Sequence, residues 1–292
     1  MAGLLQGQKA FITGGGYSVG RACVELFQQE GAKVAFIEIN KERYDDAVKK
    51  TGALGYHGTM TDKAFLVHAI DNAAQKMGGL NILINSPAGN GTGLKMANAG
   101  KGGLIVELTD EVLDNMNLMH IKSYVWATQA AIPHMLKAGR GSIVQFGSVA
   151  STNPGWSEAY GIHKSAQTAL AYQGCMEHAP IINSNALICG WMEHAVSSVM
   201  QRSPKELTAI LNEHVLHRGN TFADLAKACL FLSSDLGRAI NGELLFAEGG
   251  QTRSQSNMNT VMRDFYAQMK EPAFAAKQQQ NMNAVTTAEL RK

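Results

Sequence analysis

The sequence predicts a single doubly wound α/β domain, with a parallel sheet of about seven strands and helices on both faces. Short apolar runs alternate with helical patterns along the chain, which is the order of a parallel sheet covered on both sides. The clearest strands are expected at residues 9–13, 33–38, 80–85, 142–147, 182–188 and 243–247, and a weaker one at 54–57. No internal repeat interrupts this order.

The first expected strand runs into a glycine cluster, Gly14 to Gly16, and a helical pattern that contains Gly20 follows at once. Glycines permit a tight turn and the close approach of backbone to a pyrophosphate, whose charge the helix N-terminus then meets. The second strand ends in Glu38, where a carboxylate would accept hydrogen bonds from an adenosine ribose. A glycine-rich turn alone is as often structural as functional, but this order of strand, turn, helix, strand and acid predicts a dinucleotide site.

Tyr160 and Lys164 are four residues apart, so they share one face of a helix. A fixed positive neighbour favours the phenolate of a tyrosine, whose ordinary pKa is about 10, so the hydroxyl could exchange a proton with a substrate oxygen near neutral pH. Ser148 ends a strand-like run, where its hydroxyl could hold the same oxygen. On an arbitrary helix, a tyrosine and a lysine at this spacing are usually two solvated surface side chains. Here the glycine turn and the acidic residue upstream make a catalytic role the better interpretation.

Taken together, these residues resemble the short-chain dehydrogenase/reductase family over roughly residues 5–252. Residues 83–89 are similar to the family's Asn-Asn-Ala-Gly segment, and residues 128–135 to the end of its long central helix. Residues 222–234 are similar to its penultimate helix, and residues 242–250 to its last strand. The resemblance implies a Rossmann-fold oxidoreductase that interconverts a secondary alcohol and a ketone with NAD.

The resemblance also implies a role for each site residue. Tyr160 would take the hydroxyl proton, Ser148 would hold the same oxygen, and Lys164 would bind the nicotinamide ribose, with Trp191 beside the substrate. The cofactor-binding residues would be Gly14, Gly16, Tyr17, Ser18, Val19, Glu38, Thr59, Met60, Asn85, Tyr160, Lys164, Gly190 and Met192. Glu38 would favour NAD over NADP, because its carboxylate would repel a 2′-phosphate.

The sequence departs from the family pattern at four places. Ser18 stands where the family has the middle glycine of the turn, and His120 stands where it has the catalytic asparagine. After the sixth strand, Cys189 and Gly190 replace the usual Pro-Gly, and His194 replaces the threonine. After the third strand, Thr59 beside Met60 replaces an acidic residue. An imidazole has an ordinary pKa of about 6.5, so His120 could relay protons near neutral pH. A histidine that only caps a backbone carbonyl is an equally good interpretation.

The composition favours a folded oligomer and excludes several classes of function. Of 292 residues, 45% are hydrophobic and 17% charged, which suits a buried core and subunit interfaces, and we expect a homo-oligomer, either a tetramer or a dimer. A net charge of +2 without basic runs argues against a nucleic-acid partner. No apolar run is long enough for a membrane span, and the N-terminus does not read as a signal sequence.

The four cysteines show no Cys-x-x-Cys spacing, which favours reduced thiols and a cytoplasmic location. His214 and His217 could share a helix face, but no cysteine or carboxylate cluster completes a ligand set, so no metal site is expected.

We expect the domain to span residues 1–252, followed by an extension at 253–292 with a short amphipathic helix and a polar tail. The glycine-rich stretch 89–103 reads as a surface insertion or as a loop that shapes the substrate site. Residues 192–206 read as a substrate lid or as helix core, and the tail could close a neighbouring subunit's site. Two rival functions stay open: a dinucleotide-binding protein with little activity, and a structural protein that keeps only the fold.

Overall fold

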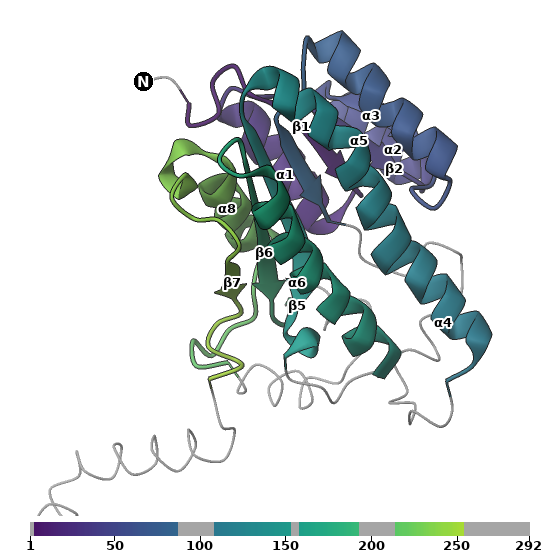
Figure 1. The fold of residues 1–292 in the computed structure, drawn as a ribbon, viewed down its shortest axis with the longest axis vertical. Helices are drawn as coiled ribbons and strands as arrows, with labels where there is room; N and C mark the ends of the chain where they lie inside the picture. Colours follow the sequence, from purple (N-terminus) through teal and green to yellow (C-terminus); the bar gives the residue numbers. More distant parts are fainter. Residues whose placement is uncertain (1–2, 87–107, 153–157, 193–213, 254–292) are drawn as a thin grey trace, which may run out of the picture.

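The fold of the chain is a seven-stranded parallel sheet with helices on both faces, seen in a computed structural model that describes residues 3–86, 108–152, 158–192 and 214–253 (Figure 1). The strand order is β3-β2-β1-β4-β5-β6-β7. The strands are β1 (Lys9–Thr13), β2 (Lys33–Glu38), β3 (Leu54–His57), β4 (Ile82–Asn85), β5 (Gly141–Ser148), β6 (Ile182–Cys189) and β7 (Leu244–Ala247). The predicted fold class is confirmed, including the weak strand at 54–57.

Helices connect the strands and cover the sheet. They are α1 (Ser18–Gln29), α2 (Lys41–Thr51), α3 (Lys63–Met77), α4 (Asp110–Asn117), the π-helical turn η2 (Leu118–Lys122), α5 (Ser123–Ala138), α6 (Glu158–His178) and α8 (Phe222–Ser233), with short 3₁₀ turns η3 (Val149–Ser151) and η5 (Asp235–Gly237). Figure 1 shows α3, α5 and α6 on one side of the sheet and α1 and α8 on the other. No helix in this described part is long and apolar enough to cross a membrane.

The two larger of three buried apolar clusters hold most of the helices against the sheet. One joins α1 and α8 to the sheet through residues such as Phe27, Leu225 and Ile12. The other joins α3 and α5 to the opposite face through residues such as Ile70 and Ala131. Burial on both faces explains why the strands read as nearly continuous apolar runs.

The topology fixes where a ligand can bind. The strand order reverses between β1 and β4, whose carboxyl ends pair Thr13 with Asn85. Ser148 and Cys189 are paired at the same edge, at the ends of β5 and β6. In open α/β sheets ligands bind in the crevice at this reversal, outside the carboxyl ends of the strands.

Several predicted segments lie outside the described residues. These are the stretch 89–103, nearly all of the segment 192–206 with His194, and the extension after Arg253. Their expected roles stay predictions.

Candidate active site

Ser148 and Tyr160 meet at the carboxyl edge of the sheet. Ser148 is the last residue of β5 and is buried, and its Oγ accepts a hydrogen bond from the Ala150 backbone N–H at 3.2 Å. Tyr160 lies in the first turn of α6, and a side-chain hydrogen bond joins it to Ser148. The two hydroxyls therefore lie together at this edge. That they share one substrate oxygen stays a prediction.

Lys164 lies one turn along α6 from Tyr160, between the helix and β5. Its side chain is only 3% exposed, and its Nζ donates to the Phe146 carbonyl at 2.9 Å. The same Nζ lies 5.5 Å from the centroid of the Tyr160 ring and 5.8 Å from that of Tyr124. Strand β5 thus holds the ammonium beside the face of the phenol ring.

Burial dominates the electrostatics of this pair. It raises the pKa of Tyr160, the Cys189 thiol adds to the rise, and the hydrogen bond from Ser148 offsets part of it. Burial also lowers the pKa of Lys164 to about 8, which the neighbouring Cys189 partly offsets. The expected lowering of the Tyr160 pKa is therefore wrong, because the net shift is upward and desolvation of the phenolate is its largest cause.

His120 lies in the π-helical turn η2 and faces the same cluster. Its ring meets the Tyr160 ring edge-on, with centroids 5.7 Å apart and planes at 88°. The side chain is 1% exposed, and its Nδ1 has no hydrogen-bond partner among the described residues. Burial, with smaller contributions from Lys164 and His163, holds the pKa of His120 well below 6.5. The expectation that His120 titrates near neutral pH is therefore wrong.

The glycine turn folds onto Glu38. The Glu38 Oε2 accepts from the Gly16 backbone N–H at 3.2 Å, and its Oε1 accepts from the Asn40 N–H at 2.9 Å. A Cβ on Gly16 would lie 2.4 Å from the Glu38 Cγ, and one on Gly20 would lie 2.2 Å from the Gly14 carbonyl oxygen. Only glycine fits at these two positions, so the turn is built for close backbone approach at a helix N-terminus. This cradle fits a dinucleotide.

Two residues of the turn behave differently from glycine. Ser18, the first residue of α1, has φ of +57°, in the left-handed region that the family's glycine would occupy without strain. Tyr17 lies under the Arg43 guanidinium at 4.1 Å and meets Phe222 edge-on. This contact of Arg43 was not predicted from the sequence, where the only signal for it is the place of Arg43 in the helix after Glu38. Val19 is buried and belongs to the core beneath the turn.

Three predicted cofactor residues have structural partners. The Asn85 Nδ2 donates to Gln145 Oε1 at 2.9 Å, and Asn85 is fully buried. Met60 is buried in the core, and Thr59 Oγ1 pairs with Thr61 Oγ1 at 2.8 Å. Whether Thr59, Met60 and Asn85 also touch a cofactor stays a prediction.

The chain after β6 is hydrogen-bonded to Asn220, just before α8, and to Gln251, which follows β7. The Trp191 N–H donates to Gln251 Oε1 at 3.3 Å, and its carbonyl accepts from Asn220 N–H at 2.8 Å. Met192 forms an isolated bridge with Asn220, and a Cβ on Gly190 would lie 2.8 Å from Gln251 Oε1. These bonds fix the start of the segment in which a substrate lid is predicted.

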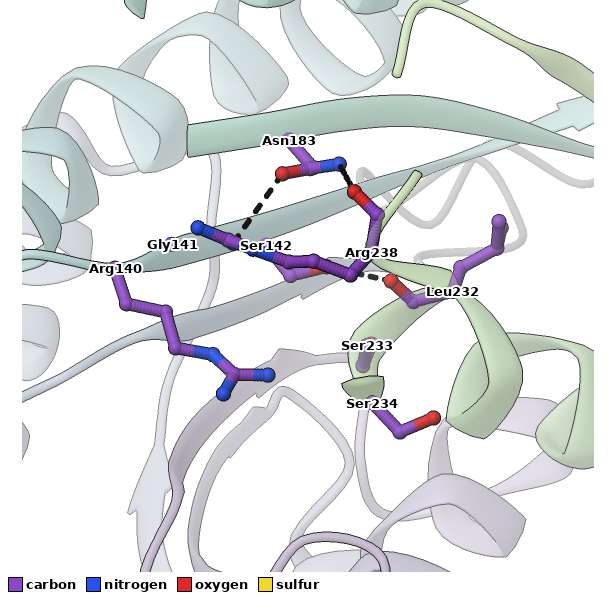
Figure 2. Close-up of a pocket in the computed structure, with 8 residues that line it drawn as sticks. All are labelled: Arg140, Gly141, Ser142, Asn183, Leu232, Ser233, Ser234 and Arg238. Carbon is purple, nitrogen blue, oxygen red and sulfur yellow. Dashed lines mark hydrogen bonds between the residues drawn. The ribbon is translucent and has the colours of Figure 1, made fainter. Parts of the chain in front are cut away.

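A small cavity lies at the other end of the sheet. Figure 2 shows it between Ser142 and Asn183 near the starts of β5 and β6, with Arg140, Arg238 and the end of α8 around it. Arg238 Nη1 donates to Asn183 Oδ1 at 3.3 Å. The cavity has a volume of about 10 Å³, which holds no more than one water, so it is not a substrate site.

The two histidines considered for a metal do not share a helix. His214 and His217 lie in a turn, where the His217 N–H donates to the His214 carbonyl at 2.9 Å and His217 has φ of +55°. Within the described ranges, no group of three or more histidine, cysteine or acidic side chains gathers in one place.

Comparison with known proteins agrees with this geometry. The sequence model of a family described as enoyl-(acyl carrier protein) reductase matches residues 14–252. The chain is 28% identical over 254 residues to 3-oxoacyl-(acyl-carrier-protein) reductase FabG of Thermotoga maritima, covering 84% of this chain and 98% of that protein. It is 27% identical over 254 residues to the probable galactose dehydrogenase GalD of Rhizobium meliloti, covering 84% and 95%.

The fold has a match among solved structures as well. The TT0495 protein of Thermus thermophilus superposes with a TM-score of 0.74 at 25% identity, covering 85% of this chain and 99% of that one. The chain belongs to the short-chain dehydrogenase/reductase family of Rossmann-fold oxidoreductases, which act on alcohols and ketones.

Proposed function

We propose that the protein is an NAD-dependent oxidoreductase that interconverts a secondary alcohol and its ketone. The observation that carries the proposal is the cluster of Ser148, Tyr160 and Lys164 at the edge of the sheet where the glycine turn meets Glu38. Relatives named as a 3-oxoacyl reductase and a galactose dehydrogenase support a carbonyl or alcohol carbon as the reacting centre.

In the oxidative direction, Tyr160 acts as the phenolate, after it has released its own proton to solvent. It then takes the proton of the substrate hydroxyl while Ser148 donates a hydrogen bond to the same oxygen. Lys164 holds a positive charge beside the phenol ring and contributes a hydrogen-bond donor for the nicotinamide ribose. Bound NAD supplies the hydride acceptor, and that chemistry is the cofactor's own. Burial keeps His120 neutral, and its ring lies edge-on beside the Tyr160 ring.

The test of the reaction is Tyr160→Phe. Removal of the proton-transferring oxygen should lower turnover by roughly 100-fold or more, while NAD binding changes only a few fold because the ring still packs. Turnover is followed by the absorbance of reduced nicotinamide in a screen of cyclic, aromatic and steroid-like secondary alcohols. Full activity in the variant would refute the mechanism.

Glu38 is proposed to select NAD over NADP. Its carboxylate is buried and fixed by two backbone N–H groups at the place where the ribose would bind, so a 2′-phosphate would meet a like charge. We expect NAD to bind at least tenfold more tightly than NADP, because a single contact between like charges costs enough binding free energy for a difference on that order. Glu38→Gln keeps the shape of the side chain and removes its charge, so the dissociation constants of NAD and NADP should become more nearly equal. Parent protein that binds NADP as tightly as NAD would contradict the assignment.

A dinucleotide-binding protein with little activity is the second candidate. The left-handed Ser18 and the raised pKa of Tyr160 favour it, because both depart from an efficient site. NAD binding without turnover of any alcohol or ketone in the screen would support this candidate. Absence of NAD binding would instead indicate a structural protein.

We also propose a cytoplasmic homo-oligomer. The free state of Cys23, Cys175, Cys189 and Cys229 supports a reducing compartment. An exposed apolar stripe along α6, formed by Ile162, Tyr172 and Met176, supports a contact with a second copy.

A further inference from the structure

A buried glutamine joins the helix that carries Tyr160 and Lys164 to the turn that carries His120. Gln167 follows Lys164 by three residues and Tyr160 by seven, so all three lie along one side of α6. Its side chain is 1% exposed, and its Nε2 donates to the main-chain carbonyl of His120 at 3.2 Å. It contacts the backbone of His120 and leaves the imidazole free to face Tyr160.

The accepting carbonyl belongs to an irregular part of the helix. In the π-helical turn η2 the backbone hydrogen bonds run to the fifth residue, and such turns are frequent at functional sites. The carbonyl of Met119, one residue earlier, accepts a hydrogen bond from the Ser123 hydroxyl. Side chains thus bond two successive carbonyls of the turn, and these bonds fix the backbone from which the His120 ring projects.

Two buried polar atoms beside this hydrogen bond have no partner of their own in the described part of the chain. Gln167 Oε1 and His120 Nδ1 are both buried and have no hydrogen-bond partner among the described residues. Buried polar atoms without partners destabilise a fold, and an apolar side chain at position 167 would avoid half of this cost. The amide at this position is therefore best explained by the bond that it donates to His120.

We propose that Gln167 is a positioning residue for the proposed oxidoreduction. It holds the His120 backbone so that the imidazole meets Tyr160 edge-on at 5.7 Å. The inference rests on the proposed function for its effect on rate, but the geometric part concerns only the His120 ring.

The first experiment replaces Gln167 with Leu, which keeps a similar size and removes the hydrogen-bond donor. Loss of one buried hydrogen bond to the turn should lower kcat roughly tenfold and leave the KM for NAD unchanged. In a His120→Leu background, Gln167→Leu should lower kcat little further, because the effects of two residues that act through one another are not additive. Gln173→Leu is the matched control, since Gln173 is exposed on the same helix.

The second experiment replaces Gln167 with Glu, which can donate to the carbonyl only when protonated. The kcat of Gln167→Glu relative to the parent should fall as pH rises, with an inflection that Gln173→Glu lacks. This profile also decides the matter if Gln167→Leu does not fold. Parallel profiles for Gln167→Glu and the parent would overturn the proposal.

The third measurement does not depend on turnover. The NMR ring resonances of His120, identified by their loss in His120→Asn, should shift in Gln167→Leu because the edge-on contact with Tyr160 changes. Unshifted resonances would overturn the positioning role even in an active enzyme. A parent protein without turnover, by contrast, would overturn the proposed function and leave this geometric test standing.

Discussion

At the scale of single residues, burial sets the chemistry of the site more than charge pairing does. Lys164 is buried and Tyr160 is half-buried, and desolvation disfavours the phenolate and the ammonium alike. The pKa of the phenol therefore rises while that of the ammonium falls to about 8. Because the Lys164 Nζ lies 5.5 Å from the centroid of the Tyr160 ring, we expect the first proton to be lost from the pair rather than from either residue alone.

This coupling predicts the pH profile. Oxidation needs the pair to accept a proton, so the rate of alcohol oxidation should rise with pH through about 8, the value set by the pKa of Lys164. His120→Asn should keep substantial activity and the same inflection, because burial keeps His120 neutral throughout this range. His120→Leu should lose most of its rate. An inflection near pH 6.5 that vanishes in His120→Asn would show that the histidine does titrate there.

At the scale of elements, the glycine turn and the π-helical turn carry two of the four departures from the family pattern, Ser18 and His120. Ser18 adopts the left-handed backbone that the turn requires, at a cost of about 1–2 kcal/mol for a residue with a Cβ. The turn thus keeps its shape because the surrounding strand, helix and Glu38 hold it.

Ser18→Gly should relieve this strain. We expect the free energy of unfolding to rise by about 0.5–1 kcal/mol, since part of the relief is offset by the greater freedom of glycine in the unfolded chain. NAD affinity should rise a few fold, because the backbone can then approach a phosphate more closely. Thermal unfolding and fluorescence titration with NAD measure both effects. Ser18→Ala is the control, as it keeps the Cβ, and equal behaviour of the Gly and Ala variants would rule out strain as the cause.

At the scale of the whole molecule, periodicity and motif order predicted the sheet and the places of Ser148, Tyr160, Lys164 and Glu38. These positions follow from local rules, because a parallel strand ends where its apolar run ends. The π-helical turn, the low pKa of His120 and the bond from Gln167 could not be predicted. Each of these features depends on how α6 packs against η2 across 47 residues of sequence, which no local pattern records.

The surface of α6 gives the last prediction, which concerns assembly. Ile162, Tyr172 and Met176 are 51%, 46% and 79% exposed and lie along one face, with the exposed Ser165 and Ala169 between them. A second copy that covers this stripe would bury it in a symmetric contact between two α6 helices.

Tyr172→Glu and Met176→Glu would place unpaired charges in that contact, which is costly, and should shift the mass measured by light scattering toward the monomer. Leu236→Glu, at an exposed apolar position on η5, is the control and should leave the mass unchanged. If the α6 variants keep the parent's mass, this face is not the interface; if they become monomeric and lose turnover, the assembled form is the active one.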